Sequence, residues 1–242
     1  SAASTGPGFG ADAAGGGGGS AVPLFTAPSG QPITTQLMVI SSLVSGGAPR
    51  LMIEFGTGQR TQITNMNPAT YVGGTQGLYG VWDWNLSAWN ATTAGSQYAS
   101  LTITSTSNPT SLTSPYTLGK SNLQAQTLTV TAATAGTAEQ VVDGTNVAIC
   151  WQSSTACSTG NTKFGWYANL PSSQEQVIFN PVFFQGAFLV NTTVPASNTP
   201  TACTTNQDTG FTYALSVANG GVFASAFPTL KDPKTGALLS DS

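Results

Sequence analysis

Histidine is absent from this chain of 242 residues, and aspartate, glutamate, lysine and arginine together make up only 6% of it. A chain without histidine lacks the side chain that most often performs acid–base chemistry near neutral pH, which is also the commonest metal ligand. No catalytic spacing appears among the remaining acidic residues. The sequence therefore predicts a protein that is not an enzyme, with no catalytic residue, no cofactor and no metal site.

Positive charge is scarce as well, and it is scattered over Arg50, Arg60, Lys120, Lys163, Lys231 and Lys234. Nucleic acids bind to clustered cations, so we expect no nucleic-acid partner. No apolar run approaches the roughly 18 residues of a membrane-spanning helix, which predicts no membrane insertion. With a net charge of only −3, the surface is expected to tolerate close subunit contacts, as in secreted fibres.

Cysteine is rare, with three residues in the chain. Cys150 and Cys157 bracket the segment "CWQSSTAC" at a spacing that suits a small disulfide loop, and Cys203 is left over. One interpretation is three buried thiols. An oxidising compartment fits better, with Cys203 unpaired or joined to another chain.

Composition divides the chain into three parts. Residues 1–22 form a Gly/Ala-rich N-terminal arm with no side chains able to build a core, residues 23–227 form a β domain, and residues 228–242 form a C-terminal tail. We expect the arm to dock on a neighbouring subunit; the sheet edge of its own domain is the other candidate. Its glycine run is Gly15, Gly16, Gly17, Gly18 and Gly19.

The β domain shows short apolar or alternating runs separated by turn residues, and no helical periodicity longer than two turns. The predicted fold class is all-β, with partial or modified propeller-like antiparallel sheets and long loops such as Ser105–Asn122. Gln185-Gly186 is expected to close a tight hairpin. The predicted strands are Leu37–Val44, Arg50–Phe55, Gly77–Asn85, Ser100–Thr106, Ala125–Ala132, Val147–Gln152, Gly165–Leu170, Val177–Asn180, Pro181–Gln185, Ala187–Thr193, Gly210–Ser216 and Val222–Phe227.

Few residues are candidates for a functional site. Trp84 and Trp89 are candidate adhesive aromatics, because tryptophan faces stack on apolar sugar rings; tryptophan also fills β cores. Glu54, inside an apolar strand, is expected to pair with Arg60. Glu175 is expected at a solvated rim of the sheet, as is Lys163.

Several segments together resemble the C-terminal region of PilY-type proteins, which are type IV pilus assembly and tip-adhesin proteins. They are "PLFTA" (Pro23–Ala27), "QPIT" (Gln31–Thr34), "LMIEFGTGQR" (Leu51–Arg60), "QGLYGVWD" (Gln76–Asp83), "KFGWYANLPSSQEQVIFNPVFFQGAFLVNTTVP" (Lys163–Pro195) and "TGFTYALSVANGG" (Thr209–Gly221). The resemblance implies a modified β-propeller at the bacterial cell surface, in or on a fimbrium. The acidic Asp-x-Asp-x-Asp-Gly type of loop is missing, so no calcium site is carried over.

A chain that holds only the last part of a propeller presents open sheet edges, and open edges tend to pair with other strands. The partner is expected to be another copy of the chain, in an oligomer or filament, or another pilus or PilY segment. The leading hypothesis is a non-enzymatic extracellular structural protein, pilus-associated or a self-assembling filament subunit. The alternative is an adhesin or ligand-binding module of a pilus-tip complex.

Overall fold

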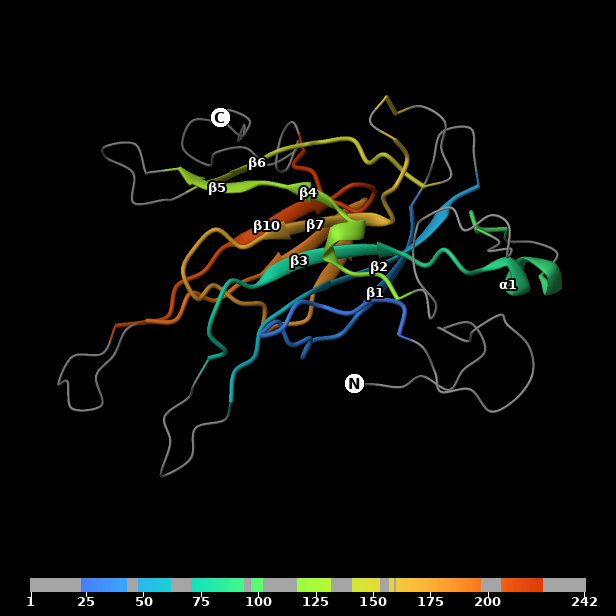
Figure 1. Ribbon diagram of the computed structural model, residues 1–242. Helices are drawn as coiled ribbons and strands as arrows, with labels where there is room; N and C mark the ends of the chain where they lie inside the picture. The colour runs from blue at the N-terminus through green and yellow to red at the C-terminus, as the bar shows by residue number, and fades with distance from the viewer. Residues whose placement is uncertain are drawn as a thin grey trace.

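The computed structural model describes residues 23–42, 48–61, 71–93, 97–101, 117–131, 141–152, 157–158, 160–196 and 206–223. Within these residues the chain forms short strands in open antiparallel and mixed sheets, with one short α-helix (Figure 1). The predicted all-β, partly propeller-like class is confirmed. The elements are β1 (Met38–Ser42), β2 (Arg50–Gly56), β3 (Gly77–Trp82), α1 (Ser87–Thr92), the 3-10 turn η1 (Lys120–Asn122), β4 (Gln124–Gln126), β5 (Leu128–Thr131), β6 (Val141–Gly144), β7 (Gly165–Asn169), β8 (Val182–Phe184), β9 (Ala187–Asn191) and β10 (Thr212–Ser216).

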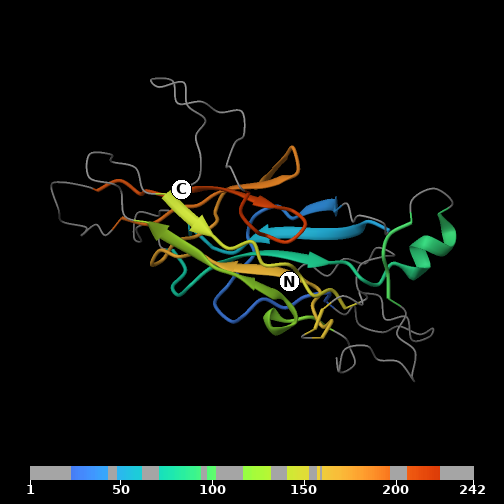
Figure 2. The same cartoon turned by 90° about the horizontal axis from the view of Figure 1, so that it is seen from above.

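The central sheet has the strand order β1-β2-β3-β7-β4. β1, β2, β3 and β7 pair antiparallel, whereas β4 runs parallel to β7. A second sheet, in the order β10-β9-β8, and a two-stranded ribbon of β5 and β6 complete the described fold. Figure 2 shows the orange and red strands of the second sheet beside the blue and teal strands of the central one.

One face of the central sheet carries an aromatic row. Phe55, Tyr79 and Tyr167 stand opposite one another on β2, β3 and β7, with ring centroids 5.3 Å and 6.3 Å apart. Phe25, from the segment before β1, covers the first two rings at 5.9 Å and 5.4 Å. Aromatic pairs at such separations contribute beyond the area that they bury, so this row fixes the register of three strands.

The opposite face is built around Trp166, which is fully buried. Gly80 lies directly opposite it on β3, and a Cβ atom at Gly80 or at Gly220 would collide with the indole. The ring therefore lies between two backbone segments that only glycine leaves open. Phe188 of β9 meets the same indole edge-on at 6.1 Å, and this contact joins the two sheets.

The strand predicted at Ala125–Ala132 is broken in two, which is a correction. β4 ends at Gln126 and joins the central sheet, while β5 begins at Leu128 and pairs with β6. The reason is the buried side chain of Gln126, which donates to the carbonyls of Val147 and Asn219 and accepts the backbone N–H of Val147. These long-range bonds decide where the chain leaves the sheet.

Other strand predictions are also wrong. The predicted strands at residues 147–152 and 177–180 form isolated bridges or irregular backbone, and the strand β6 was not predicted. Residues 87–92 form α1, where the sequence showed no helical period. α1 has six residues, too few for a periodic signal. Across the described residues, no helix combines the length and apolarity needed to cross a membrane.

Candidate assembly surface

The β8–β9 hairpin forms as predicted. Phe184 faces Ala187 across a two-residue loop, and both loop residues have positive φ, 48° at Gln185 and 86° at Gly186. This is the conformation of the turn that matches the right-handed twist of paired strands. The turn presents β8 at the outer edge of the second sheet, since β9 lies between β8 and β10.

All three residues of β8 are exposed, although all three are apolar. Val182, Phe183, Phe184 and the nearby Phe179 each expose between 47% and 58% of their surface. These four residues are called the β8 apolar edge below. Soluble proteins usually blunt an edge strand with charge or cover it, and an uncovered apolar edge is a template for pairing with another strand.

The backbone of β8 is also available on one side. Phe184 stands opposite Ala187 next to the turn, and Val182 stands opposite Leu189 two residue pairs further on, with Phe183 and Phe188 between them. In an antiparallel pair such positions alternate between bonded and non-bonded pairs, so Phe183 directs its N–H and C=O away from β9. Among the described residues no strand pairs with that side.

A second exposed apolar segment begins beside the first. The backbone N–H of Gln36 donates to the Asn180 side-chain oxygen at 3.0 Å, which ties the start of β1 to the start of β8. Leu37, just before β1, and Val39, on β1 at the edge of the central sheet, are about as exposed as the β8 residues. The fold thus brings two open sheet edges close together at this hydrogen bond.

No charged residue occurs between residues 176 and 207. The nearest charge before this span, Glu175, is buried, which corrects its predicted place at a solvated rim. Its carboxylate accepts the hydroxyls of Thr192 at 2.6 Å and Tyr213 at 2.7 Å, and the backbone N–H of Ser172 at 3.1 Å. Burial and the carboxylate together raise the pKa of Tyr213. Glu175 is a structural anchor beneath the β8–β10 sheet.

Glu54 does not pair with Arg60. The Glu54 carboxyl is fully buried, and neither of its oxygens has a hydrogen-bond partner of normal geometry in the described residues. Burial raises its pKa well above the ordinary value, and the Trp166 indole opposes this only in part. Arg60 instead lies 5.6 Å over the ring of Tyr71. Glu54 is therefore a buried acid of the core, and its environment disfavours the charged form.

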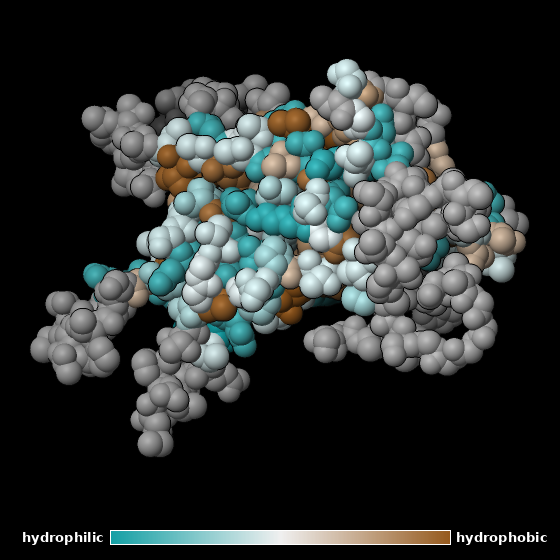
Figure 3. Space-filling model, in the orientation of Figure 1, coloured by the Kyte–Doolittle hydropathy of each residue, from teal (hydrophilic) through white to brown (hydrophobic). Residues whose placement is uncertain are grey.

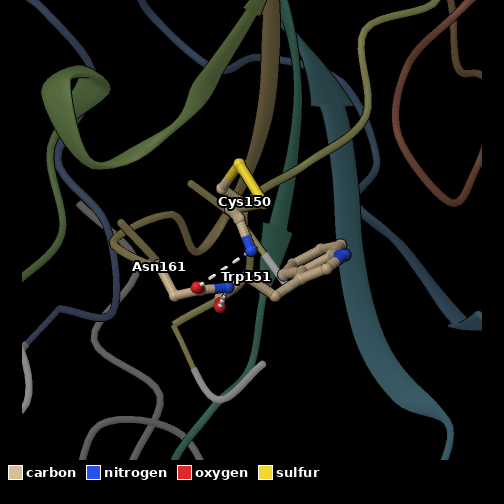
Figure 4. The surroundings of a disulfide bond; sticks show 4 residues. Cys150, Trp151 and Asn161 are labelled. Carbon is tan, nitrogen blue, oxygen red and sulfur yellow. Dashed lines mark hydrogen bonds between the residues drawn. A yellow bond between two sulfur atoms is a disulfide. The ribbon is translucent and has the colours of Figure 1, made fainter. Parts of the chain in front are cut away.

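The disulfide between Cys150 and Cys157 is formed, as predicted, with a Cα–Cα distance of 5.7 Å (Figure 4). Asn161 donates its side-chain N–H to the Trp151 carbonyl at 2.8 Å and so fixes the backbone next to the bridge. The Trp151 ring faces Arg50, whose guanidinium lies 4.2 Å away. The disulfide loop thus places an aromatic ring on a buried arginine.

The two candidate adhesive tryptophans lie in different environments. Trp84 is only 5% exposed and packs against Phe164, so its face cannot meet a ligand, and that expectation is wrong. Trp89 lies on α1 and is 49% exposed. Lys163, predicted at a rim, is half-buried and donates to the Ser121 carbonyl at 2.9 Å.

Several predicted features lie outside the described residues. They are Cys203, the arm 1–22 with its glycines, most of the loop Ser105–Asn122 and the tail 228–242. The arm, the tail and the domain boundaries stay predictions. On the face shown in Figure 3, polar residues cover most of the described surface.

Sequence reasoning missed the β8 apolar edge as a surface, although it predicted strands there. The available signal was the run "VFF" between Pro181 and the turn at Gln185. A strand with one buried face alternates, and an unbroken apolar run is usually buried on both faces. Pro181 and the turn instead confine these residues to a three-residue edge strand, which only the sheet order reveals.

Comparison with known proteins finds a similarity in fold and no match in sequence. No protein-family model matches the chain, and no curated protein matches it in sequence. The fold is similar to the crystal structure of the Pseudomonas aeruginosa PilY1 C-terminal domain, with a TM-score of 0.50 and 19% sequence identity. The match covers 84% of this chain and 36% of that chain, so this chain spans about a third of the domain whose fold it shares.

Proposed function

We propose that this protein is a non-enzymatic, extracellular structural subunit that works in a pilus-associated or self-assembling surface filament of a bacterium. The observation that carries the proposal is the β8 apolar edge, exposed on a fold similar to the PilY1 C-terminal domain. An edge strand with exposed apolar side chains on both faces is unfavourable in a monomer, because these side chains contact water. In an assembly the same strand can pair with a neighbouring subunit.

Three further features support this function. The described core is held by aromatic rows and a disulfide, which suits an oxidising location outside the cell. The buried acidic groups of the described residues, Glu54, Asp83 and Glu175, lie within the packing and are almost fully covered, away from any surface where a substrate would bind. Low charge reduces repulsion between neighbouring subunits.

The test is the location and assembly of the native protein. Sheared surface filaments are collected and probed with an antibody to this chain, by immunogold electron microscopy and by mass spectrometry. The expected result is label along or at the tips of filaments, with the Cys150–Cys157 bridge intact. Recovery of the protein only from the cell interior, or with both cysteines reduced, would overturn the proposal.

A variant lacking residues 1–22 tests the arm separately. If the arm docks on a neighbour, the shortened protein stays soluble and unassembled while its melting temperature is unchanged. Normal filaments built from the shortened protein would show that the arm is not needed for assembly. The β8 apolar edge would then remain as the proposed contact.

A second candidate function, adhesion, is favoured by the exposure of Trp89 on α1. An exposed indole offers a flat apolar face for a sugar ring. A glycan array is probed with the intact protein, with Trp89→Ala and with a matched control, Val147→Ala, at a similarly exposed position. Binding that is lost in Trp89→Ala alone supports adhesion, and an array without signal removes it.

A further inference from the structure

The β8 apolar edge is complementary to itself. We infer that β8 of one molecule pairs antiparallel with β8 of a second copy of this chain, about a two-fold axis that passes beside Phe183. The inference rests on the proposed function, because it names the contact through which an assembly subunit meets its neighbour. The result is a symmetric dimer as the unit of assembly.

The backbone supports pairing centred on Phe183. Its N–H and C=O point away from β9, so in a two-fold pair each Phe183 donates to and accepts from the Phe183 of the other copy. A closed symmetric contact of this kind uses one surface patch on both molecules. The neighbouring outward position is Pro181, which has no N–H to donate, so the ladder ends there.

The side chains fit the same register. In antiparallel pairing about Phe183, Val182 of one copy stands opposite Phe184 of the other, and this happens twice. Aromatic residues opposite β-branched residues are among the favourable cross-strand pairs. Both residues are about half exposed in the single chain, so the pairing covers surface that is otherwise in contact with water.

A second copy is favoured over an unrelated partner by charge and register. Residues 176–207 carry no charge, so two copies of this segment meet without repulsion and without an unpaired ion. Pairing in this register needs no separate complementary surface, because Val182, Phe183 and Phe184 of each copy form both sides of the contact. An edge that is short and ends in proline favours a closed pair over an extended sheet.

The size of the contact predicts a reversible dimer. Four apolar side chains that are about half exposed leave on the order of 400 Å² per copy, so pairing buries on the order of 800 Å² in total. Interfaces of that size are at the weak end of specific association. The dimer is therefore expected at high local concentration, as in a filament, and only partly in dilute solution.

The first experiment measures association by sedimentation equilibrium from about 10 μM to about 1 mM. The full chain is compared with Phe183→Lys, which places two like charges opposite each other, and with Val141→Lys, at an exposed site on β6. Phe183→Lys should weaken dimerisation by at least about tenfold, and the control should not. Melting curves of all three exclude misfolding.

The second experiment determines the register by cross-linking, in a Cys203→Ser background. Phe183→Cys places two thiols at a bonded antiparallel position, where Cα atoms are about 5.5 Å apart and a disulfide fits. Phe184→Cys alone should not cross-link, because Val182 of the other copy faces it. A mixture of Val182→Cys and Phe184→Cys proteins should. Equal cross-linking at 183, at 184 and in a Val141→Cys control overturns the inference, as does a full chain that stays monomeric at every concentration.

The proposed dimer and the proposed function can be refuted independently. Filaments that incorporate Phe183→Lys as well as the native chain would overturn the dimer as the unit of assembly and leave the structural function standing. A chain that dimerises with the expected register and is never found on the cell surface would overturn the function and leave the β8 contact standing.

Discussion

Replacing Glu54 by methionine is expected to stabilise the fold. The carboxyl is fully buried on β2, in a cross-strand row with Gly80 and Trp166, and its oxygens lack hydrogen-bond partners of normal geometry in the described residues. A buried polar group without a partner costs about 1–3 kcal/mol. Methionine has similar length and no such cost, so the free energy of unfolding should rise by about 2 kcal/mol, or about 4–8 °C in Tm.

The pH dependence gives the prediction a second measurement. Because burial raises the pKa of Glu54 in the folded state, the contribution of this group to stability is fully present below its ordinary pKa of 4.5 and is lost as pH rises through the raised value. Asp83, whose pKa burial raises to about 6, adds a loss of the same sign near that pH. Glu54→Met should remove the first loss, and Glu54→Met with Asp83→Asn should remove both.

The assay is urea unfolding followed by tryptophan fluorescence at several pH values between about 4.5 and about 8.5, a range that begins at the ordinary pKa of Glu54 and includes the pKa of about 6 of Asp83. The gain from Glu54→Met should grow with pH. A variant that is less stable than the native protein at pH 8, or one that keeps the native pH profile after both substitutions, would show that Glu54 has a partner that holds its charge. The core would then contain a buried ion pair or network.

Three further predictions concern the core. Glu175→Ala removes the acceptor of two hydroxyls and one N–H, and should lower the free energy of unfolding by about 3 kcal/mol, whereas Glu175→Gln should lose less. Gly80→Ala places a methyl group against the Trp166 indole and should cost about 2 kcal/mol by urea unfolding, with a change in near-ultraviolet circular dichroism. Replacing Cys150 and Cys157 by serine should lower stability by about 2.5 kcal/mol, from the entropy of a short loop, and an unchanged Tm would contradict this.

Much of the secondary structure could be predicted locally. Alternation and turn residues place β2, β3, β7 and β9 close to their observed bounds, and "QG" at 185–186 predicts the hairpin because glycine accepts the positive φ of its second position. The spacing of Cys150 and Cys157 favoured the disulfide over buried thiols, and the structure forms it. These features depend on neighbours in the chain, which is why a sequence pattern records them.

The environment of single polar and aromatic residues could not be predicted in this way. Glu54 and Glu175 look alike in the sequence as acids near apolar runs, yet one is buried without a normal hydrogen bond and the other is buried with three. Trp84 and Trp89, five residues apart, differ in exposure by a factor of about ten. Each difference depends on segments that lie far away in the chain.

The sequence by itself determined the fold class, the low charge, the small disulfide loop and the place of the β8–β9 turn, because these follow from composition and from contacts between near neighbours. Only the tertiary structure decided that "VFF" lies at an open edge. Strand order depends on which strands pair across the sheet, and a local apolar run reads the same in a buried strand as in an exposed one. Because β8 lies at that edge, it is an exposed strand and not a core strand, and it forms the surface on which we expect a second copy to bind.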